Sequence, residues 1–315
     1  MIKIKRYSPD FKSQWDELVS KSKNGTFLFF RDYMDYHADK FLDHSFLIFY
    51  KNKLEGILPG NISDSIFYSH QGLTYGGLIL TDKIRTDDVL QIFKLINKEL
   101  KDAGVNEVIY KPIPYIYFNY PSQEDLYALF VMNATKIGCN ISSAIFQPNK
   151  INFSELRMRG VKRSLREKIE IKETDRFELF WPLLTDNLSN KFNKSPVHSL
   201  EEIKYLKSRF PNNIKLFIAH HLEEVIAGCV VFEMKHVIHS QYVATNERGR
   251  KLGALDLIYN ELVNNKYVTI PVFDFGHSTE NMGNFLNVNL IFQKEGFGGR
   301  GVVYEIYKYL ISQID

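Results

Sequence analysis

The sequence predicts a mixed α/β protein made of two domains. Its 315 residues, 44% hydrophobic and 14% aromatic, suffice for two ordinary hydrophobic cores. Apolar residues recur with the period of a strand in some segments and with the period of an amphipathic helix in others. An apolar strand, a polar turn and a second strand occur at 45–58 and again about 170 residues later at 215–231. We therefore expect an internal duplication, with one domain in 1–148 and the other in 149–315.

The first half alternates strand and helix patterns. An alternating segment at 2–7 predicts an edge strand, and Pro9 opens a helix. The aromatic segment 26–41 is interpreted as a helix that anchors the first core, because aromatic side chains mostly pack against other side chains. After the hairpin at 45–58, apolar residues at helical spacing predict a helix over 89–100. The turn before this helix is acidic and contains no glycine, so the first half is not expected to hold a phosphate group.

Three glycines interrupt the segment 68–77. Glycine weakens a strand and often marks a close approach of the backbone to another group. We expect this segment, with His70, Gln71 and Tyr75, to face a cleft and bind an acceptor substrate. A glycine-rich bulge with incidental polar residues is an equally acceptable interpretation.

The second half begins with a basic segment. Pro148 and Asn149 interrupt an apolar run, which indicates a linker near 147–154. The segment 155–168 predicts a helix with Arg159, Arg163 and Arg166 on one face. This helix is interpreted either as an ordinary solvated helix or as a phosphate-binding face, because guanidinium groups suit phosphate oxygens. Helices are expected over 175–193 and 200–210 before the second hairpin.

The most informative part of the chain is 242–300. A strand end at 241–244 leads into the basic turn 248–254, and apolar residues at helical spacing then predict a helix that starts near Gly253. Unpaired N–H groups and the helix dipole favour an anion at such a start. We expect a pyrophosphate site here, although a solvated basic turn is the alternative. The expected site residues are Arg248, Arg250, Lys251, Gly253 and Ala254.

At this point the sequence resembles the GNAT superfamily of acyl-CoA N-acyltransferases. Arg250-Lys-Leu-Gly253-Ala-Leu255 is similar to the Q/R-x-x-G-x-G/A pyrophosphate loop of that superfamily, with Leu255 in place of the last small residue. Phe292-Gln-Lys294-Glu-Gly296-Phe297 is similar to its Y-x-K-x-G-F element, with Phe292 where a tyrosine general acid often stands. Asp274-Phe-Gly-His-Ser278, followed by Gly283 and Asn287, is similar to the Fem-like transferases, whose two GNAT-type domains join amino acids or acyl groups to amines.

The resemblance implies two GNAT-like domains in tandem, each a central mixed sheet flanked by helices, with the first a degenerate copy. It implies acyl-CoA as co-substrate, with acetyl-CoA the expected donor, and an amine acceptor in an amino sugar, an amino acid or a cell-envelope precursor. Transfer of an amino acid from aminoacyl-tRNA is the first alternative. The sequence lacks the long coiled-coil arm expected of the peptidoglycan Fem enzymes, which counts against this alternative. A catalytically inactive double-GNAT binding module, suggested by Phe292 and Leu255, is the second.

Acyl transfer to an amine needs a base, donors for the tetrahedral oxyanion and an acid for the leaving group. The oxyanion donors are expected to be backbone N–H groups where strands splay apart near the glycine turn. The expected catalytic residues are Glu280, His277 and Asp274 as candidate bases and Tyr242 or Tyr75 as the acid. Asp274 alternatively fixes a turn. Lys294 and Arg300 are expected to contact an anionic donor or acceptor, or else to cap a helix.

Other classes of function lack support in the sequence. The formal charge of +3 is too small to indicate DNA binding, and no H-E-x-x-H or paired Cys/His spacing indicates a metal site. The two cysteines, Cys139 and Cys229, stand among apolar residues, and neither a signal peptide nor a run of ~20 apolar residues is present. We expect a cytoplasmic protein without membrane insertion, and the sequence does not predict its oligomeric state.

Overall fold

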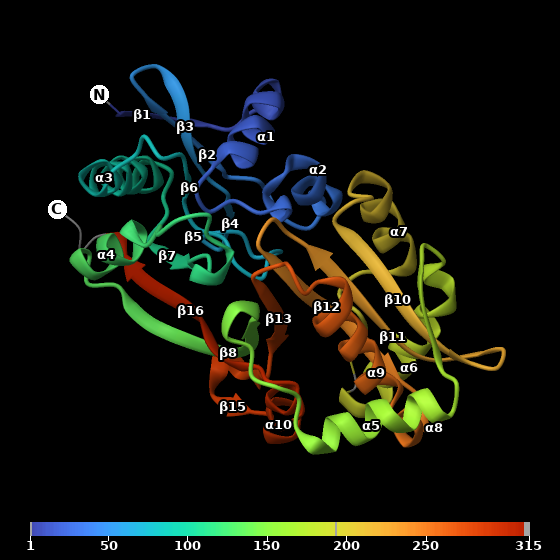
Figure 1. The fold of residues 1–315 in the computed structure, drawn as a ribbon. Helices are drawn as coiled ribbons and strands as arrows, with labels where there is room; N and C mark the ends of the chain where they lie inside the picture. Colours follow the sequence, from blue (N-terminus) through green and yellow to red (C-terminus); the bar gives the residue numbers. More distant parts are fainter. Residues whose placement is uncertain (1, 193, 312–315) are drawn as a thin grey trace. The chain divides into compact units, whose positions relative to one another are not determined.

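The computed structural model describes residues 2–192 and 194–311. The chain forms two compact units (Figure 1). The first contains the residues up to Asn140 together with Thr279–Phe285 and the chain from Val303, and the second contains Ile141–Ser278 and Leu286–Val302. The predicted division into 1–148 and 149–315 differs from these units, because the chain returns to the first unit after Ser278. Strands β8 (Thr135–Phe146) and β16 (Arg300–Leu310) each have residues in both units.

The first unit contains the predicted hairpin and its helix. Its four-stranded sheet has the order β1-β2-β3-β6, formed by β1 (Ile2–Arg6), β2 (Phe46–Tyr50), β3 (Lys53–Leu58) and β6 (Ile79–Leu80). Strands β4 (Asn61–Ser63), β5 (Ile66–Tyr68) and β7 (Glu107–Tyr110) belong to a second sheet. The helices are α1 (Lys12–Lys21), α2 (Arg31–Met34), α3 (Thr86–Asp102) and α4 (Glu124–Val131). Apolar residues of α3 pack in the core of this unit, as their spacing predicts.

The prediction of a single helix over 26–41 is wrong. The segment forms a 3₁₀ turn at Phe27–Phe29, the short α2 and a second 3₁₀ turn at Asp35–His37. Phe30 has an extended conformation (φ −63°, ψ 142°), and the carbonyl of Phe29 accepts a hydrogen bond from the Trp15 indole at 2.7 Å. The aromatic side chains therefore anchor the core as predicted, but from separate turns.

The second unit is built on a sheet in which β8 is followed by β13, β12, β11, β10 and β9. These strands are β9 (Glu170–Thr174), β10 (Ile214–His221), β11 (Glu224–Glu233), β12 (Val237–Thr245) and β13 (Val272–His277). The helices are α5 (Glu155–Arg166), α6 (Trp181–Phe192), α7 (Leu200–Arg209), α8 (Glu247–Leu252), α9 (Ala254–Glu261) and α10 (Val288–Gly296). Helix α9 packs its apolar face against β10 and β11, while α6 packs against β12 through Trp181 and Tyr242.

Two strands of this sheet diverge. β12 and β13 are parallel and pair only from Val237/Val272 to His239/Asp274. Beyond these residues β12 continues to Thr245 paired with β11, and β13 continues to His277 paired with β8. The predicted splaying of strands is therefore present, but it begins after His239 and not at the glycine turn.

The region predicted as a basic turn at 248–254 contains the short helix α8. Asn246 caps this helix by accepting a hydrogen bond from the Gly249 N–H at 2.8 Å. Gly253 ends it in the left-handed conformation (φ +80°), and α9 begins at Ala254, where the sequence predicts a helix start. Six residues without an apolar period give no helical signal, which explains why α8 was not predicted.

Cys229 is buried, and burial raises the pKa of its thiol to about 12. Cys139 is exposed although apolar residues stand near it in the sequence, because alternate residues of β8 face opposite sides. Among the residues that the structure describes, no helix is long and apolar enough to cross a membrane. The same residues include no cluster of three or more side chains suited to holding a metal ion.

Candidate functional site

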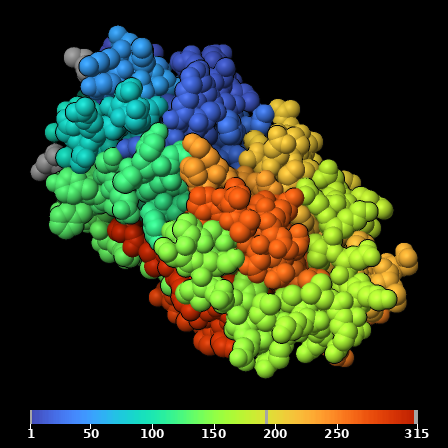
Figure 2. Space-filling view, in the orientation of Figure 1, coloured from blue at the N-terminus to red at the C-terminus, as the bar shows by residue number. Residues whose placement is uncertain are grey.

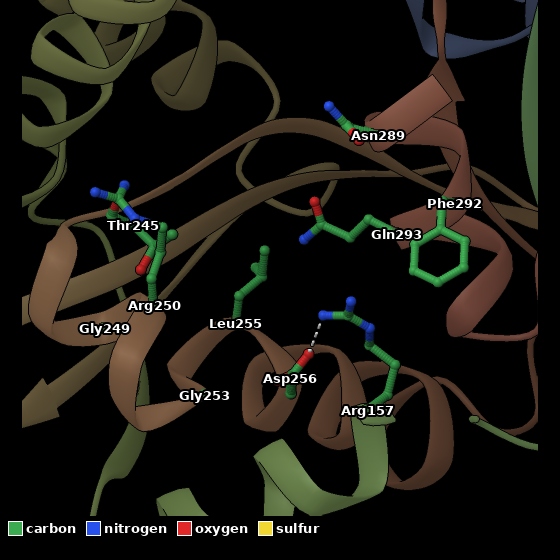
Figure 3. A pocket seen from close by; sticks show the side chains of 10 residues that line it. All are labelled: Arg157, Thr245, Gly249, Arg250, Gly253, Leu255, Asp256, Asn289, Phe292 and Gln293. Atoms are coloured by element: carbon green, nitrogen blue, oxygen red, sulfur yellow. Dashed lines mark hydrogen bonds and ion pairs between the residues drawn. The ribbon is translucent and has the colours of Figure 1, made fainter. Parts of the chain in front are cut away.

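A pocket of about 300 Å³ lies beside the start of α9 (Figure 3). Helices α8 and α9 form one side and α10 forms the other, with Arg157 of α5 reaching in between. Leu255 and Gln293 both point into it. The lining residues are Arg157, Thr245, Gly249, Arg250, Gly253, Leu255, Asp256, Asn289, Phe292 and Gln293. This volume is at the lower end of ligand pockets, so it suits the phosphate part of a nucleotide rather than a whole coenzyme.

The pocket depends on Gly253. Its left-handed conformation is one that glycine adopts at no steric cost. A Cβ atom at this position would also lie 2.6 Å from the carbonyl oxygen of Gly160 in α5. Glycine therefore allows the chain to turn from α8 into α9 while α5 packs against the turn. The first N–H groups of α9 have no partner within the helix, and they give this end a partial positive charge.

The three basic residues predicted for this site lie in different environments. Arg250 lines the pocket and donates to the Thr245 carbonyl at 3.0 Å. Arg248 is exposed and pairs with Glu224 at 3.0 Å, and exposed Lys251 pairs with Glu247 at 2.7 Å. Ala254 is fully buried in the core of the unit and does not line the pocket.

Arg157 supplies a second cation that the sequence did not indicate as part of this site. Its guanidinium lies 3.0 Å from Asp256 and stacks over Phe297, with 5.2 Å between the guanidinium carbon and the ring centre. Burial raises the pKa of Asp256 above its ordinary value, although the Arg157 guanidinium acts in the opposite direction. Arg157 belongs to the predicted basic helix, but its orientation toward α9 depends on helix packing that local spacing does not reveal.

A second polar group surrounds Asp274, which is 0% exposed. Its Oδ2 atom lies 2.7 Å from Nδ1 of His239, and its Oδ1 atom accepts hydrogen bonds from the Ser142 hydroxyl and the Gly276 N–H. The contact with Gly276 agrees with the alternative in which Asp274 fixes a turn. His239 was not predicted, and its side chain keeps 14% of its surface exposed. The arrangement is a carboxylate that orients an imidazole.

Lys294 connects α10 to the end of β13. Its buried ammonium donates to the carbonyls of Gly276 at 2.7 Å and His277 at 2.5 Å. Burial lowers the pKa of Lys294 to about 8 and that of His277 to about 4. In this conformation Lys294 holds the backbone of β13, which is a different role from the predicted contact with a substrate anion.

No protein-family model and no curated protein matches this sequence. Solved structures do match the fold over almost the whole chain. FemX has a TM-score of 0.71 at 10% identity, over 99% of this chain and 98% of FemX. L-PGS from Bacillus licheniformis has a TM-score of 0.62 at 12% identity, over 95% of this chain and 91% of that one. A tandem GNAT protein from the clavulanic acid biosynthesis pathway has 0.53 at 10% identity, with 99% of both chains covered.

The chain has a Fem-like tandem GNAT fold. The predicted fold class, mixed α/β with two GNAT-like domains, is therefore confirmed.

The other predicted catalytic residues, Tyr242 and Glu280, have surroundings of their own. The Tyr242 hydroxyl lies 2.5 Å from Nδ1 of His198, and burial raises the pKa of Tyr242 to about 12. Glu280 lies in β14 (Thr279–Glu280), which belongs to the first unit. Arg300 is exposed and donates to the Gly299 carbonyl at 2.6 Å and to a carbonyl of the last turn of α10 at 3.5 Å. The helix-capping alternative describes Arg300 well.

The three predicted acceptor-binding residues of the first unit occupy different environments. Burial lowers the pKa of His70 to about 3, and its ring lies 5.5 Å from that of His37. Gln71 is exposed, and its side chain and backbone N–H both bond to Asn61. Tyr75 is buried, with its ring 4.8 Å from that of Tyr117. Of the three, only Gln71 presents its surface to solvent.

Proposed function

We propose that this chain is a GNAT-type N-acyltransferase that moves an acyl group from acyl-CoA to an amine. The observation that carries the proposal is the pocket of phosphate size at the start of α9, which Gly253, Arg250 and Arg157 line. The start of a helix favours an anion. The pyrophosphate of CoA would bind there. Acetyl-CoA is the simplest donor of this class, and the amine belongs to an amino sugar, an amino acid or a cell-envelope precursor.

The distance along β12 from the pocket to the point where the strands separate favours a donor with a long flexible arm. Thr245 lies at the pocket, and His239 lies where β12 and β13 separate. Along an extended strand at ~3.3 Å per residue, these two positions are roughly 20 Å apart. A group bound by its phosphates at Thr245 reaches His239 only through an extended flexible chain, which the pantetheine arm of CoA provides. β12 has backbone groups beyond His239 that no longer pair with β13, and such groups can bond to the amides of this arm.

The proposed chemistry is direct transfer without a covalent enzyme intermediate. The amine nitrogen attacks the thioester carbon and forms the C–N bond, the nitrogen loses a proton to a base, and the C–S bond breaks to release CoA thiolate. Cys229 is buried with its thiol pKa raised to about 12, and exposed Cys139 does not line the pocket, so neither cysteine supports a covalent route. The residues of the pocket bind and orient the donor.

The alternative of an aminoacyl-tRNA donor rests on a different observation. Helix α5 lies at the surface of the second unit (Figure 2) and exposes a row of basic side chains. These are Arg159, Lys162, Arg163 and Arg166. Arg163 also donates to the Lys251 carbonyl at 2.6 Å, so this face is fixed next to the donor turn. A nucleic acid with several phosphates in contact with this face would bind with strong salt dependence.

Calorimetric titration with acetyl-CoA, CoA and total tRNA separates the two donors. For an acyl-CoA enzyme we expect both CoA species to bind, with Arg250→Ala weakening them about tenfold, as for loss of one charge-assisted hydrogen bond. Arg248→Ala is the matched control, because Arg248 is on the same helix but pairs with Glu224 outside the pocket. Absence of CoA binding together with salt-sensitive tRNA binding that Arg159→Ala/Arg166→Ala weakens would overturn the proposal in favour of the alternative.

A further inference from the structure

We propose that His239 is the general base of the transfer reaction and that Asp274 positions it. This inference rests on the proposed acyltransferase function and adds to it the residue that removes the proton from the acceptor amine. His239 and Asp274 are opposite each other in the last pair of residues that join β12 to β13. The side-chain contact of 2.7 Å between them therefore lies where the two strands separate.

The surroundings of Asp274 determine which nitrogen of His239 carries a proton. The carboxylate is completely buried, and its Oδ1 atom already accepts from Ser142 and Gly276. An ionised carboxylate only accepts hydrogen bonds, so Nδ1 of His239 must donate to Oδ2. In the neutral ring Nε2 then carries the free electron pair, which is the form a general base requires.

The Nε2 side of the ring faces a position without a side chain. A Cβ atom built on Gly276 would lie 3.3 Å from Cε1 and 3.9 Å from Nε2 of His239. Gly276 has a φ of +75° and no side chain, so only its backbone packs against this edge of the ring. The His239 side chain keeps 14% of its surface exposed, and in the proposal the amine approaches the ring from this exposed part.

The predicted bases of the same unit are less suitable. Asp274 has no exposed surface and its carboxylate is bonded to three partners, Ser142, His239 and Gly276. It therefore reaches no substrate. His277 is largely buried, and burial lowers its pKa to about 4, which makes it a weak proton acceptor. Among the described residues, His239 contacts Asp274 and interacts electrostatically with His277, both on β13, and these two groups in turn lie near Lys294 of α10. The residue paired with His239 on β11 is the apolar Phe232.

In the proposed step the amine nitrogen attacks the acyl carbon and its excess proton moves to Nε2 of His239. The tetrahedral intermediate collapses, the C–S bond breaks and the electron pair leaves with the CoA thiolate. The imidazolium, stabilised by Asp274, then returns its proton to the thiolate or to solvent. Atoms and charges balance without any further reactant.

Two measurements test this role, and the first does not depend on the acceptor. NMR of protein labelled with ¹⁵N-histidine is expected to show His239 as the Nδ1–H tautomer, with its signal assigned by its loss in His239→Gln. An Nε2–H tautomer would overturn the proposal. The second measurement is thiol release from acetyl-CoA, first with water and then with glucosamine and the protein amino acids as acceptors.

We expect His239→Gln to lower the rate by 100-fold or more and to abolish the acid limb of the pH–rate profile, as for loss of a general base. Asp274→Asn should lower the rate at least tenfold and shift that limb, whereas His236→Gln, just before β12, should change neither. Titration with acetyl-CoA is run in parallel. If His239→Gln binds acetyl-CoA normally and its rate is unchanged, the role of His239 as base is rejected and the acyltransferase proposal stands. If the wild type neither binds nor cleaves acetyl-CoA, both proposals are rejected.

Discussion

Gly253 and Gly160 pack backbone against backbone. A Cβ atom on Gly253 would lie 2.6 Å from the carbonyl oxygen of Gly160, and one on Gly160 would lie 1.8 Å from a carboxylate oxygen of Asp256. Ser164 of the same helix donates to the Leu252 carbonyl at 2.7 Å. Helix α5 is thus attached along the turn that joins α8 to α9, and this attachment directs Arg157 into the pocket.

The first prediction is that Gly253→Ala destabilises the protein much more than Gly104→Ala. Both glycines have positive φ values, +80° and +77°, so alanine costs about 1–2 kcal/mol of conformational strain at either site. Only at Gly253 does the new methyl group meet backbone, which adds about 1–3 kcal/mol of overpacking. Chemical denaturation measures the difference. Equal losses in the two variants would show that α5 does not pack closely on the turn.

The second prediction concerns Lys294, and the change is Lys294→Met. The variant keeps the aliphatic stem but leaves the carbonyls of Gly276 and His277 without their donor, at a cost of about 1–3 kcal/mol for each buried group. Removal of a buried charge offsets part of this loss. We expect a net destabilisation of about 2 kcal/mol in denaturant titrations at pH 7. Lys251→Met is the control, because Lys251 is exposed and surface ion pairs contribute about 0–1 kcal/mol.

Local patterns in the sequence predicted those features that depend on neighbouring residues. The hairpins, the helix start at Ala254 and the placement of Gly253 and Arg250 beside it follow from apolar spacing and one short motif. Arg157 and Asp256, or Ser142 and Asp274, are distant in the sequence, and only helix packing and strand register bring them together. Register is not encoded in any single segment, which is why the contact between His239 and Asp274 was not predicted although Asp274 was singled out.

The third prediction separates a structural from a catalytic role for Tyr242. Its hydroxyl bonds to the ring and the backbone N–H of His198, so Tyr242→Phe should cost about 1 kcal/mol of stability. A general acid contributes 10²–10⁴-fold to a rate, and a hydroxyl that is already occupied does not contribute this much. We expect thiol release from acetyl-CoA to fall less than tenfold. A 100-fold lower rate of thiol release in a normally folded variant would instead support Tyr242 as the general acid.

The fourth prediction is that His70 makes the protein sensitive to acid. Burial first, and then the nearby His37 and Lys111, lowers the pKa of His70 from 6.5 to about 3. Between these values the unfolded chain binds a proton at this position and the folded chain does not, so stability falls as the pH decreases from 6.5 toward 3. The slope for one such group is at most about 1.4 kcal/mol per pH unit. Asp125, whose pKa burial raises to about 6, acts in the opposite direction between pH 6 and its ordinary value.

His70→Asn removes this group while keeping the backbone conformation, because asparagine tolerates the left-handed region in which His70 lies (φ +70°). We expect the variant to lose less stability than the wild type between pH 6.5 and 4, measured by urea unfolding at several pH values. Gln71→Asn, a neutral change at the next residue, should leave the slope as in the wild type. An unchanged slope in His70→Asn would mean that solvent reaches the imidazole, and the segment 68–77 would then be open enough to admit an acceptor.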